Sequence, residues 1–249
     1  MVPRLLLLIA LICPSIFSTQ ITLDLNSLPS TQGWTFVSPS GLTETSVFSL
    51  ADDVLQQNTM GGFNNIAYYS LQGPGLYNPA LPFDLIFSAV VLKEELFPPP
   101  DASNGFEVGV TFDNVQATMG IGLSRISYSS PMTVGVNIPS NNSANVRTFD
   151  MHWDGSGAFC YFIAGALAGC AAGTPMSGSP AAPGIFFGDG VNFANAEIDV
   201  TALAFLQPSV PEPATGWMFA IGILGIICAR LKSVRRRTVN FRSGAHYSR

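Results

Sequence analysis

The stretch Phe106-Glu107-Val108-Gly109-Val110-Thr111-Phe112-Asp113 decides the fold class of this chain. Its apolar side chains alternate with polar residues and glycine, which is the period of a β-strand that buries one face. The same alternation returns in residues 83–91, 119–123 and 149–153, whereas helical periodicity is almost absent. We therefore expect antiparallel sheets, each with one covered face, and Phe106, Val108, Val110 and Phe112 turned inward.

Turn-forming residues separate the predicted strands along the chain. They stand at Gly73-Pro74-Gly75, Pro98–Asp101, Asn141-Asn142, Asp154–Gly157 and in the Gly-rich segment 178–184. Gly, Pro, Asn and Asp at such positions end regular structure and reverse the chain. About a dozen short strands separated by such turns predict an all-β sandwich or barrel.

Residues 1–18 have the composition and order of a secretory signal peptide. Arg4 precedes an apolar run over residues 5–12, and Pro and small residues follow as far as Ser18. The run of eight residues is too short to span a bilayer, which takes about 20 residues. We expect signal peptidase to cleave near Ser18. Cys13 does not indicate a lipoprotein, because Ile12 stands where a small residue is needed.

The other end of the chain combines a Pro-rich linker, an apolar run and a basic stop. Residues 208–213 form the linker, 214–231 a predicted transmembrane helix and 232–249 a basic tail. The membrane stop consists of Arg230, Lys232, Arg235, Arg236 and Arg237. Such a basic cluster marks the cytoplasmic side, so the preceding chain should lie outside the membrane.

This tail resembles the PEP-CTERM sorting signal of Gram-negative bacteria, which is read by a membrane protease-transferase called exosortase. The resemblance rests on Pro211-Glu212-Pro213, the following Ala214-Thr215-Gly216, the Gly-spaced apolar run and the arginine cluster. It implies an inner-membrane-anchored precursor, exosortase as a partner, and a mature protein in the cell envelope or outside the cell. The segment 238–249 departs from the pattern, because such tails usually end sooner. An ordinary single-pass anchor is the alternative.

The chain between the two ends is strongly acidic. Residues 20–213 hold Lys93, Arg125 and Arg147 against all sixteen Asp and Glu residues, a formal charge of −13. So negative a domain repels phosphate backbones, which argues against nucleic acid as a partner.

The order of predicted elements in the second half resembles the concanavalin A-like, laminin-G-like jelly roll found in many PEP-CTERM proteins. A hairpin over residues 149–163 and a return strand at 167–170 precede Phe187-Gly188-Asp189 and a closing strand at 196–205. The resemblance implies an antiparallel two-sheet jelly-roll sandwich as the ectodomain, residues 20–207. Related sandwiches include sugar-binding modules and retaining β-glucanases.

Cys160 and Cys170 flank this hairpin symmetrically about Gly165, and we predict a disulfide between them. They are the cysteines that remain once both ends are removed, and the exported compartment is oxidising. A three-residue loop at 164–166 would place them opposite each other. A two-residue turn at Ala164-Gly165 would instead pair Cys160 with Gly169. Two buried thiols are the alternative.

Two groups of residues could carry catalysis, and neither is complete. Glu197-Ile198-Asp199 resembles the first half of the β-glucanase signature, but Ala202 stands where the second Glu should be. Retaining hydrolysis needs two carboxylates, so we predict that the chain is not an enzyme. A second group, Asp150, His152 and Asp154, shares one face of a predicted strand and is interpreted as a solvated face.

A binding function is the remaining expectation, with weak candidates. Trp34, Tyr68 and Tyr69 are candidate sugar contacts, and Asp189 and Asn192, with Asn195, are candidate calcium ligands; Tyr77 and Trp153 are further aromatic candidates. No other cofactor or metal is expected. The sequence thus predicts an envelope or extracellular-matrix protein whose non-catalytic sandwich binds carbohydrate such as polysaccharide. A degenerate glycan hydrolase of the concanavalin A-like class is the alternative.

Overall fold

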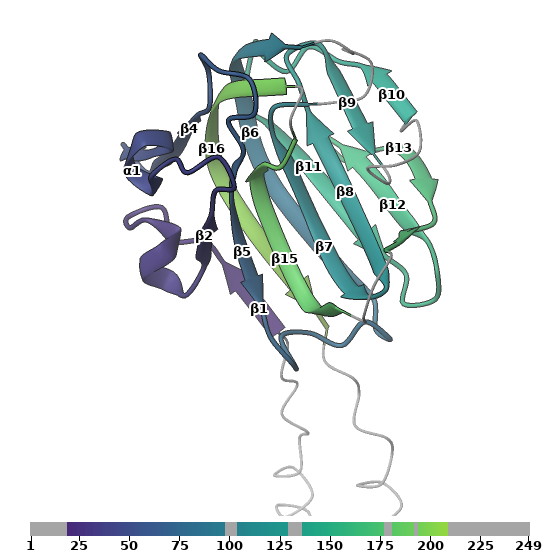
Figure 1. The fold of residues 1–249 in the computed structure, drawn as a ribbon. Coiled ribbons are helices and arrows are strands. Elements are labelled where there is room, and N and C mark those ends of the chain that lie inside the picture. The colour runs from purple at the N-terminus through teal and green to yellow at the C-terminus, as the bar shows by residue number, and fades with distance from the viewer. Residues whose placement is uncertain (1–18, 98–103, 129–135, 177–180, 192–193, 209–249) are drawn as a thin grey trace, which may run out of the picture. The chain divides into compact units, whose positions relative to one another are not determined.

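The computed structural model describes residues 19–97, 104–128, 136–176, 181–191 and 194–208 (Figure 1). The predicted signal peptide, the sorting motif, the transmembrane helix and the basic tail lie outside these residues. Within the described part, no helix has the length and apolar character needed to cross a membrane.

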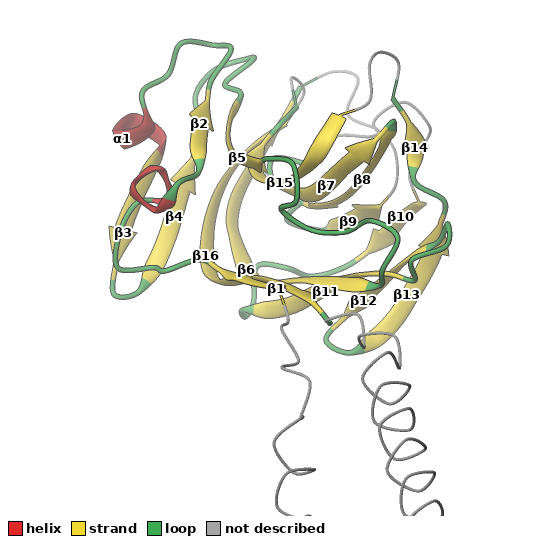
Figure 2. Ribbon diagram, turned by 90° about the horizontal axis from the view of Figure 1, so that it is seen from below, coloured by secondary structure: helices red, strands yellow, loops and turns green. Residues whose placement is uncertain are grey.

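The described chain folds as two antiparallel eight-stranded sheets that face each other across one core (Figure 2). Sheet A has the order β13-β12-β11-β6-β16-β4-β3, with β1 paired to β16, and sheet B has the order β10-β9-β8-β7-β15-β5-β2, with β14 paired to β8. The strands of sheet A are β1 (Thr19–Thr22), β3 (Phe48–Ala51), β4 (Val54–Asn58), β6 (Phe83–Leu96), β11 (Arg147–Trp153), β12 (Phe159–Ile163), β13 (Ala166–Ala171) and β16 (Ala194–Gln207). Those of sheet B are β2 (Thr35–Val37), β5 (Ala67–Gln72), β7 (Glu107–Asp113), β8 (Val115–Ile121), β9 (Arg125–Tyr128), β10 (Val136–Pro139), β14 (Thr174–Pro175) and β15 (Ala181–Asp189). A 3₁₀ turn (Pro29–Gln32) and the short helix α1 (Glu44–Val47) complete the described elements. The predicted antiparallel sandwich is confirmed.

Two long strands form the centre of sheet A, where the sequence predicted only short ones. β6 and β16 have 14 residues each and pair with each other over most of their length. The pairing register shifts at Glu197/Ile198 and again at Val200/Ala202, so the alternation in the sequence is interrupted within one continuous strand. β1 pairs with the end of β16, with Thr19 opposite Gln207, so the two ends of the described domain lie side by side.

The stretch at residues 106–113 lies as predicted on its inner face. Phe106, Val108 and Val110 are fully buried and Phe112 is 5% exposed. The outer face of β7 is also largely buried, whereas the alternation in the sequence predicted a strand with only one buried face. A side chain at Gly109 would meet the ring of Phe186 at 2.4 Å, because Phe186 lies over this glycine.

Candidate functional site

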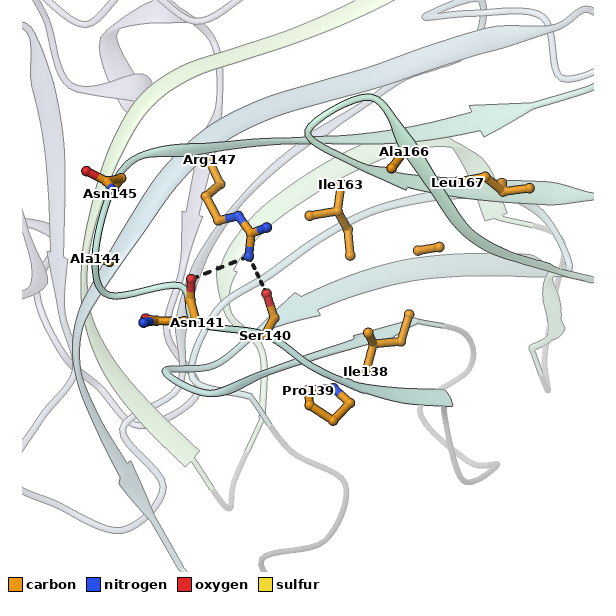
Figure 3. A pocket seen from close by; sticks show the side chains of 11 residues that line it. Ile138, Pro139, Ser140, Asn141, Ala144, Asn145, Arg147, Ile163, Ala166 and Leu167 are labelled. Carbon is orange, nitrogen blue, oxygen red and sulfur yellow. Dashed lines mark hydrogen bonds between the residues drawn. The ribbon is translucent and has the colours of Figure 1, made fainter.

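An open pocket of about 820 Å³ lies between an edge strand of each sheet (Figure 3). Strand β10 at the edge of sheet B forms one side, the hairpin of β12 and β13 at the edge of sheet A the other, and the loop that joins β10 to β11 closes one end. The lining residues are Ile138, Pro139, Ser140, Asn141, Ala144, Asn145, Arg147, Ile163, Ala166, Leu167 and Ala168. Four polar side chains thus gather in an aliphatic pocket, and Leu167 is 60% exposed within it.

Arg147 is the charged residue of this lining. It is the first residue of β11, and its guanidinium turns toward the loop, where Nη1 donates hydrogen bonds to Ser140 Oγ and to the Asn141 carbonyl oxygen (Figure 3). Nη1 also lies 3.4 Å from Asn142 Oδ1, which accepts a hydrogen bond from it. Nη1 therefore donates all the hydrogen bonds that the guanidinium of Arg147 makes to the described residues.

The loop under Arg147 is fixed by the buried side chain of Asn142. Asn142 is fully buried, and its Nδ2 donates to the carbonyl oxygens of Gly122 and Arg125 at 2.8 and 3.0 Å. Its backbone N–H donates to Leu123 O, and its own carbonyl accepts from Val91 N–H. Ser140 Oγ donates to Asn142 Oδ1 at 2.8 Å. The sequence predicted only a turn at Asn141-Asn142; the structure shows a loop held firmly against two strands.

The charge of Arg147 is left without an acidic partner among the described residues. Lys93 pairs with Glu197 at 2.5 Å, and Arg125 lies 3.7 Å from Glu94. The pocket lining itself contains neither Asp nor Glu. In a domain whose formal charge over residues 20–207 is −12, Arg147 therefore makes this pocket a local positive site.

The aromatic residues predicted to contact sugar lie mostly in the core, which corrects that prediction. Trp34 is 4% exposed and packs edge-on against Phe187. Tyr69 is fully buried, and its hydroxyl donates to Glu44 Oε1 at 2.7 Å; burial raises the pKa of Tyr69 above its usual range. Tyr68 alone of the three is partly exposed, on β5, and none of the three lines the pocket.

Tyr77 and Trp153 are also core residues. Tyr77 is 4% exposed, and its hydroxyl donates to the carbonyl oxygen of Thr111 at 2.8 Å. Trp153 is 6% exposed, and its indole N–H donates to the carbonyl oxygen of Pro79 at 2.8 Å. Because the polar tip of each ring is satisfied inside the domain, neither ring offers a face to a ligand.

The predicted calcium ligands do not converge in the described part of the chain. The buried carboxylate of Asp189 accepts hydrogen bonds from the Thr59 hydroxyl at 2.6 Å and from the Val191 N–H, and burial raises its pKa well above the usual range. Asn195 is buried and donates to Gly62 O, whereas Asn192 lies outside the described residues. No group of three or more His, Cys, Asp or Glu side chains is placed to hold a metal in the part that the structure describes.

The β-glucanase-like residues occupy the outer face of sheet A. Glu197 and Asp199 alternate with the buried Ile198 and Val200, and Glu197 forms the ion pair with Lys93. Ala202 lies after a register shift in the same strand and adds no carboxylate.

The same outer face holds a histidine between two aspartates. His152 Nδ1 lies 2.6 Å from Asp84 Oδ1, on the neighbouring strand β6, and Asp84 was not singled out in the sequence. The pKa of Asp150 is raised to about 6 by burial and by the charge of Asp84. Asp154 does not join this group: its carboxylate accepts the N–H groups of the following turn, which lower its pKa to about 2.

Cys160 and Cys170 are joined by a disulfide, with 4.0 Å between their Cα atoms. The turn between their strands has two residues, Ala164 and Gly165, both with positive φ. A β-bulge at Ala168 then restores the register that places the cysteines opposite each other. The expectation that only a three-residue loop would pair them is wrong, because it left out this extra residue in β13.

The sandwich is similar to solved structures of proteins that act on carbohydrate. A carbohydrate esterase from the Shiga toxin-encoding bacteriophage phi24B matches with a TM-score of 0.51 and 10% identity, covering 76% of this chain and 100% of the other. The β-agarase B of Zobellia galactanivorans matches with a TM-score of 0.50 and 10% identity, covering 78% and 95%. At this identity the likeness shows the jelly-roll fold alone.

The C-terminal segment, unlike the sandwich, is similar to a known family in its sequence. No curated protein matches the sequence. Residues 209–237, however, match the family described as the PEP-CTERM protein-sorting motif. The match contains the Pro211-Glu212-Pro213 motif, the apolar run and the arginine cluster. The chain therefore carries a PEP-CTERM sorting motif after a β-sandwich domain, and is exported as a membrane-anchored precursor that exosortase sorts to the cell envelope.

Proposed function

We propose that this protein is a structural or adhesive component of the cell envelope or extracellular matrix, and that its sandwich is a non-catalytic module that binds carbohydrate. In this proposal signal peptidase removes residues 1–18, and residues 214–231 hold the precursor in the membrane until exosortase acts. The pocket around Arg147 is the proposed binding site.

The observation that carries the proposal is the composition of this pocket on a rigid frame. Sugars present hydroxyl groups at their rims and C–H groups on their faces. Asn145 and the Nδ2 group of Asn141 supply hydrogen-bonding groups for the first, because Asn141 Oδ1 already accepts from Ser143. The aliphatic side chains of Ile163 and Leu167 supply an apolar surface for the second. Because Asn142 fixes the loop before any ligand arrives, little conformational entropy is lost on binding.

The proposal of a binding module rather than a hydrolase rests on the placement of the carboxylates. Glycoside hydrolysis ordinarily needs a pair of Asp or Glu side chains that flank the bond. The pocket lining has none, and Glu197 is engaged by Lys93.

The hydrolase alternative has one observation in its favour, the group of Asp84, His152 and Asp150. A carboxyl with a pKa of about 6, such as Asp150, can keep its proton in mildly acidic solution and donate it, while a neighbouring group acts as the base. His152 and Asp84 are 40% and 38% exposed in their side chains, so a substrate could reach them.

A glycan array probed with the full-length protein in detergent, run beside a reducing-sugar assay on the bound glycans, separates the two functions. We expect binding without release of reducing ends. Ala144→Trp should abolish binding because the indole fills the pocket, whereas Ala80→Trp, the same change at an exposed alanine outside the lining, should leave binding intact. Release of reducing ends that is lost in Asp84→Asn would overturn the proposal.

A further inference from the structure

We infer that the pocket around Arg147 selects an acidic sugar, and that Arg147 binds its carboxylate. This inference rests on the proposed carbohydrate-binding function and names the class of sugar.

The guanidinium of Arg147 has one edge that makes no hydrogen bond to the described residues. The hydrogen bonds of Arg147 to Ser140, Asn141 and Asn142 all leave from Nη1. Nε and Nη2 make no hydrogen bond to any residue that the structure describes. These two N–H groups point in parallel, and a planar carboxylate accepts both at once. The contacts at Nη1 therefore orient the guanidinium, and they leave the edge formed by Nε and Nη2 free to bind a carboxylate.

No carboxylate of the described residues forms an ion pair with Arg147. An arginine that served only to stabilise the fold would be expected to pair with one of the sixteen carboxylates of the chain, as Arg125 does with Glu94. Among the described residues Arg147 instead makes hydrogen bonds to neutral oxygens only, beside the loop that closes one end of the pocket, and the described lining contains neither Asp nor Glu. A ligand carboxylate would thus meet an uncompensated positive charge.

The acidity of the domain limits the charge density of the ligand. The domain around the pocket, residues 20–207, has a formal charge of −12, and its field repels a polymer with a charge on every residue. One arginine can offset one carboxylate at contact. We therefore infer an isolated uronate flanked by neutral sugars, in preference to a densely sulfated chain.

The neutral part of the pocket fits the neutral part of such a sugar. Ile163 of β12 faces Ile138 across the pocket (Figure 3), and Leu167 of β13 lines the pocket on the same side as Ile163. These aliphatic walls suit the C–H face of a pyranose ring, while Asn145 at the rim can reach its hydroxyl groups.

Titration calorimetry on the full-length protein in detergent tests the inference with a matched pair of probes. The acidic probe is cellobiouronic acid, in which one uronate is joined to one neutral sugar, and it is compared with its carboxyl-reduced neutral disaccharide; digalacturonic acid, with a carboxylate on each sugar, is the densely charged comparison. We expect cellobiouronic acid to bind about 10- to 100-fold more tightly than its neutral partner, the range for hydrogen bonds to a charged group, and more tightly than digalacturonic acid.

The variants assign this preference to Arg147. Arg147→Gln should remove it, Arg147→Lys should restore only part of it because an ammonium lacks the bidentate edge, and Lys93→Gln should leave it unchanged. Thermal unfolding of each variant shows whether it folds. If Arg147→Gln does not fold, Arg147→Lys decides: affinity equal to that of the unaltered protein contradicts a bidentate contact.

The remaining outcomes separate this inference from the proposed function. Equal affinity for acidic and neutral disaccharides, with binding still blocked by Ala144→Trp, would overturn the claim that Arg147 binds a carboxylate. The proposed carbohydrate-binding function would be unaffected by that result. If a sulfated disaccharide binds as tightly as the uronate disaccharide or more tightly, the claim that Arg147 recognises a planar carboxylate is overturned. Binding of a leucine-terminated tetrapeptide with no binding of any glycan overturns both.

Discussion

The ring of Phe112 in sheet B lies 5.3 Å from the indole of Trp153 in sheet A, measured between ring centroids. Phe112 also contacts the rings of Phe83 and Phe159, so it joins the two sheets at one end of the core. Truncating it leaves a cavity between sheets that are held apart by their other side chains. Phe112→Ala should therefore lower the free energy of unfolding by about 3 to 5 kcal/mol, measured by urea denaturation.

Phe63 offers a matched control for this truncation, because it is also a phenylalanine but is 54% exposed. Phe63→Ala should cost clearly less, since most of its surface is already in water. A loss under about 1 kcal/mol for Phe112→Ala would mean that β7 is turned the other way, because a register slip of one residue exposes the whole inner set.

The disulfide between Cys160 and Cys170 should stabilise the domain by closing a loop of about eleven residues. Chain-entropy arithmetic for a loop of this size gives roughly 2 to 3 kcal/mol. Unfolding in urea with and without reductant measures the difference, and Cys160→Ala/Cys170→Ala is the control that reductant should not affect. Alkylation of both thiols in the folded, oxidised protein would show that the bond is not there.

Stability should decrease as pH rises from about 4.5 to 7 because of Glu107. Burial raises the pKa of Glu107 to about 7, so the folded state holds this proton at pH values where the unfolded chain has lost it. The stabilisation is complete below the unfolded pKa and is lost as pH rises through the folded one. Asp189, whose pKa burial also raises, contributes with the same sign.

Glu107→Gln tests this pH dependence, because glutamine keeps the shape and cannot ionise. The variant should show a flatter pH profile and exceed the unaltered protein in stability at pH 8. Asp154→Asn is the control: the pKa of Asp154 is lowered to about 2, so its substitution should not change the slope between pH 5 and 8. A Glu107→Gln profile parallel to that of the unaltered protein would contradict the assignment.

The strands of this domain could be predicted because burial on one face leaves a simple alternation in the sequence. Phe149, Met151 and Trp153 turn inward from β11, as the pattern indicates. The alternation does not report the bulge at Ala168 or the register shifts in β16, since a single extra residue moves a strand without changing its composition.

The pocket could not be predicted, because its residues come together only when the edges of both sheets are in place. Ile138 and Leu167 are far apart in the chain and lie on different sheets. The signal in the sequence is the scarcity of basic residues between positions 20 and 213, because each of the three basic residues there is a candidate for binding an anionic group. Conversely, residue type alone pointed to Trp34 and Tyr69 as sugar contacts, and aromatic residues of a small sandwich fill its core more often than they line a binding face.

The sorting motif predicts the behaviour of a single substitution outside the described residues. Glu212 lies between two prolines in the matched motif. If exosortase reads this carboxylate, Glu212→Ala should leave the precursor in the inner membrane fraction, as detected by immunoblotting of separated membranes. Glu197→Ala, a change of the same type in the sandwich, should not affect sorting.

The mass of the mature protein tests the central claim, sorting by exosortase, most directly. The protein is expressed in a host that contains exosortase, and the surface fraction is analysed by intact-mass and peptide mass spectrometry. Sorting by exosortase predicts a chain that begins near Ser18 and ends near residues 211–213, without the basic tail. Recovery from the surface fraction of an uncleaved chain that still contains Arg235, Arg236 and Arg237 would contradict it.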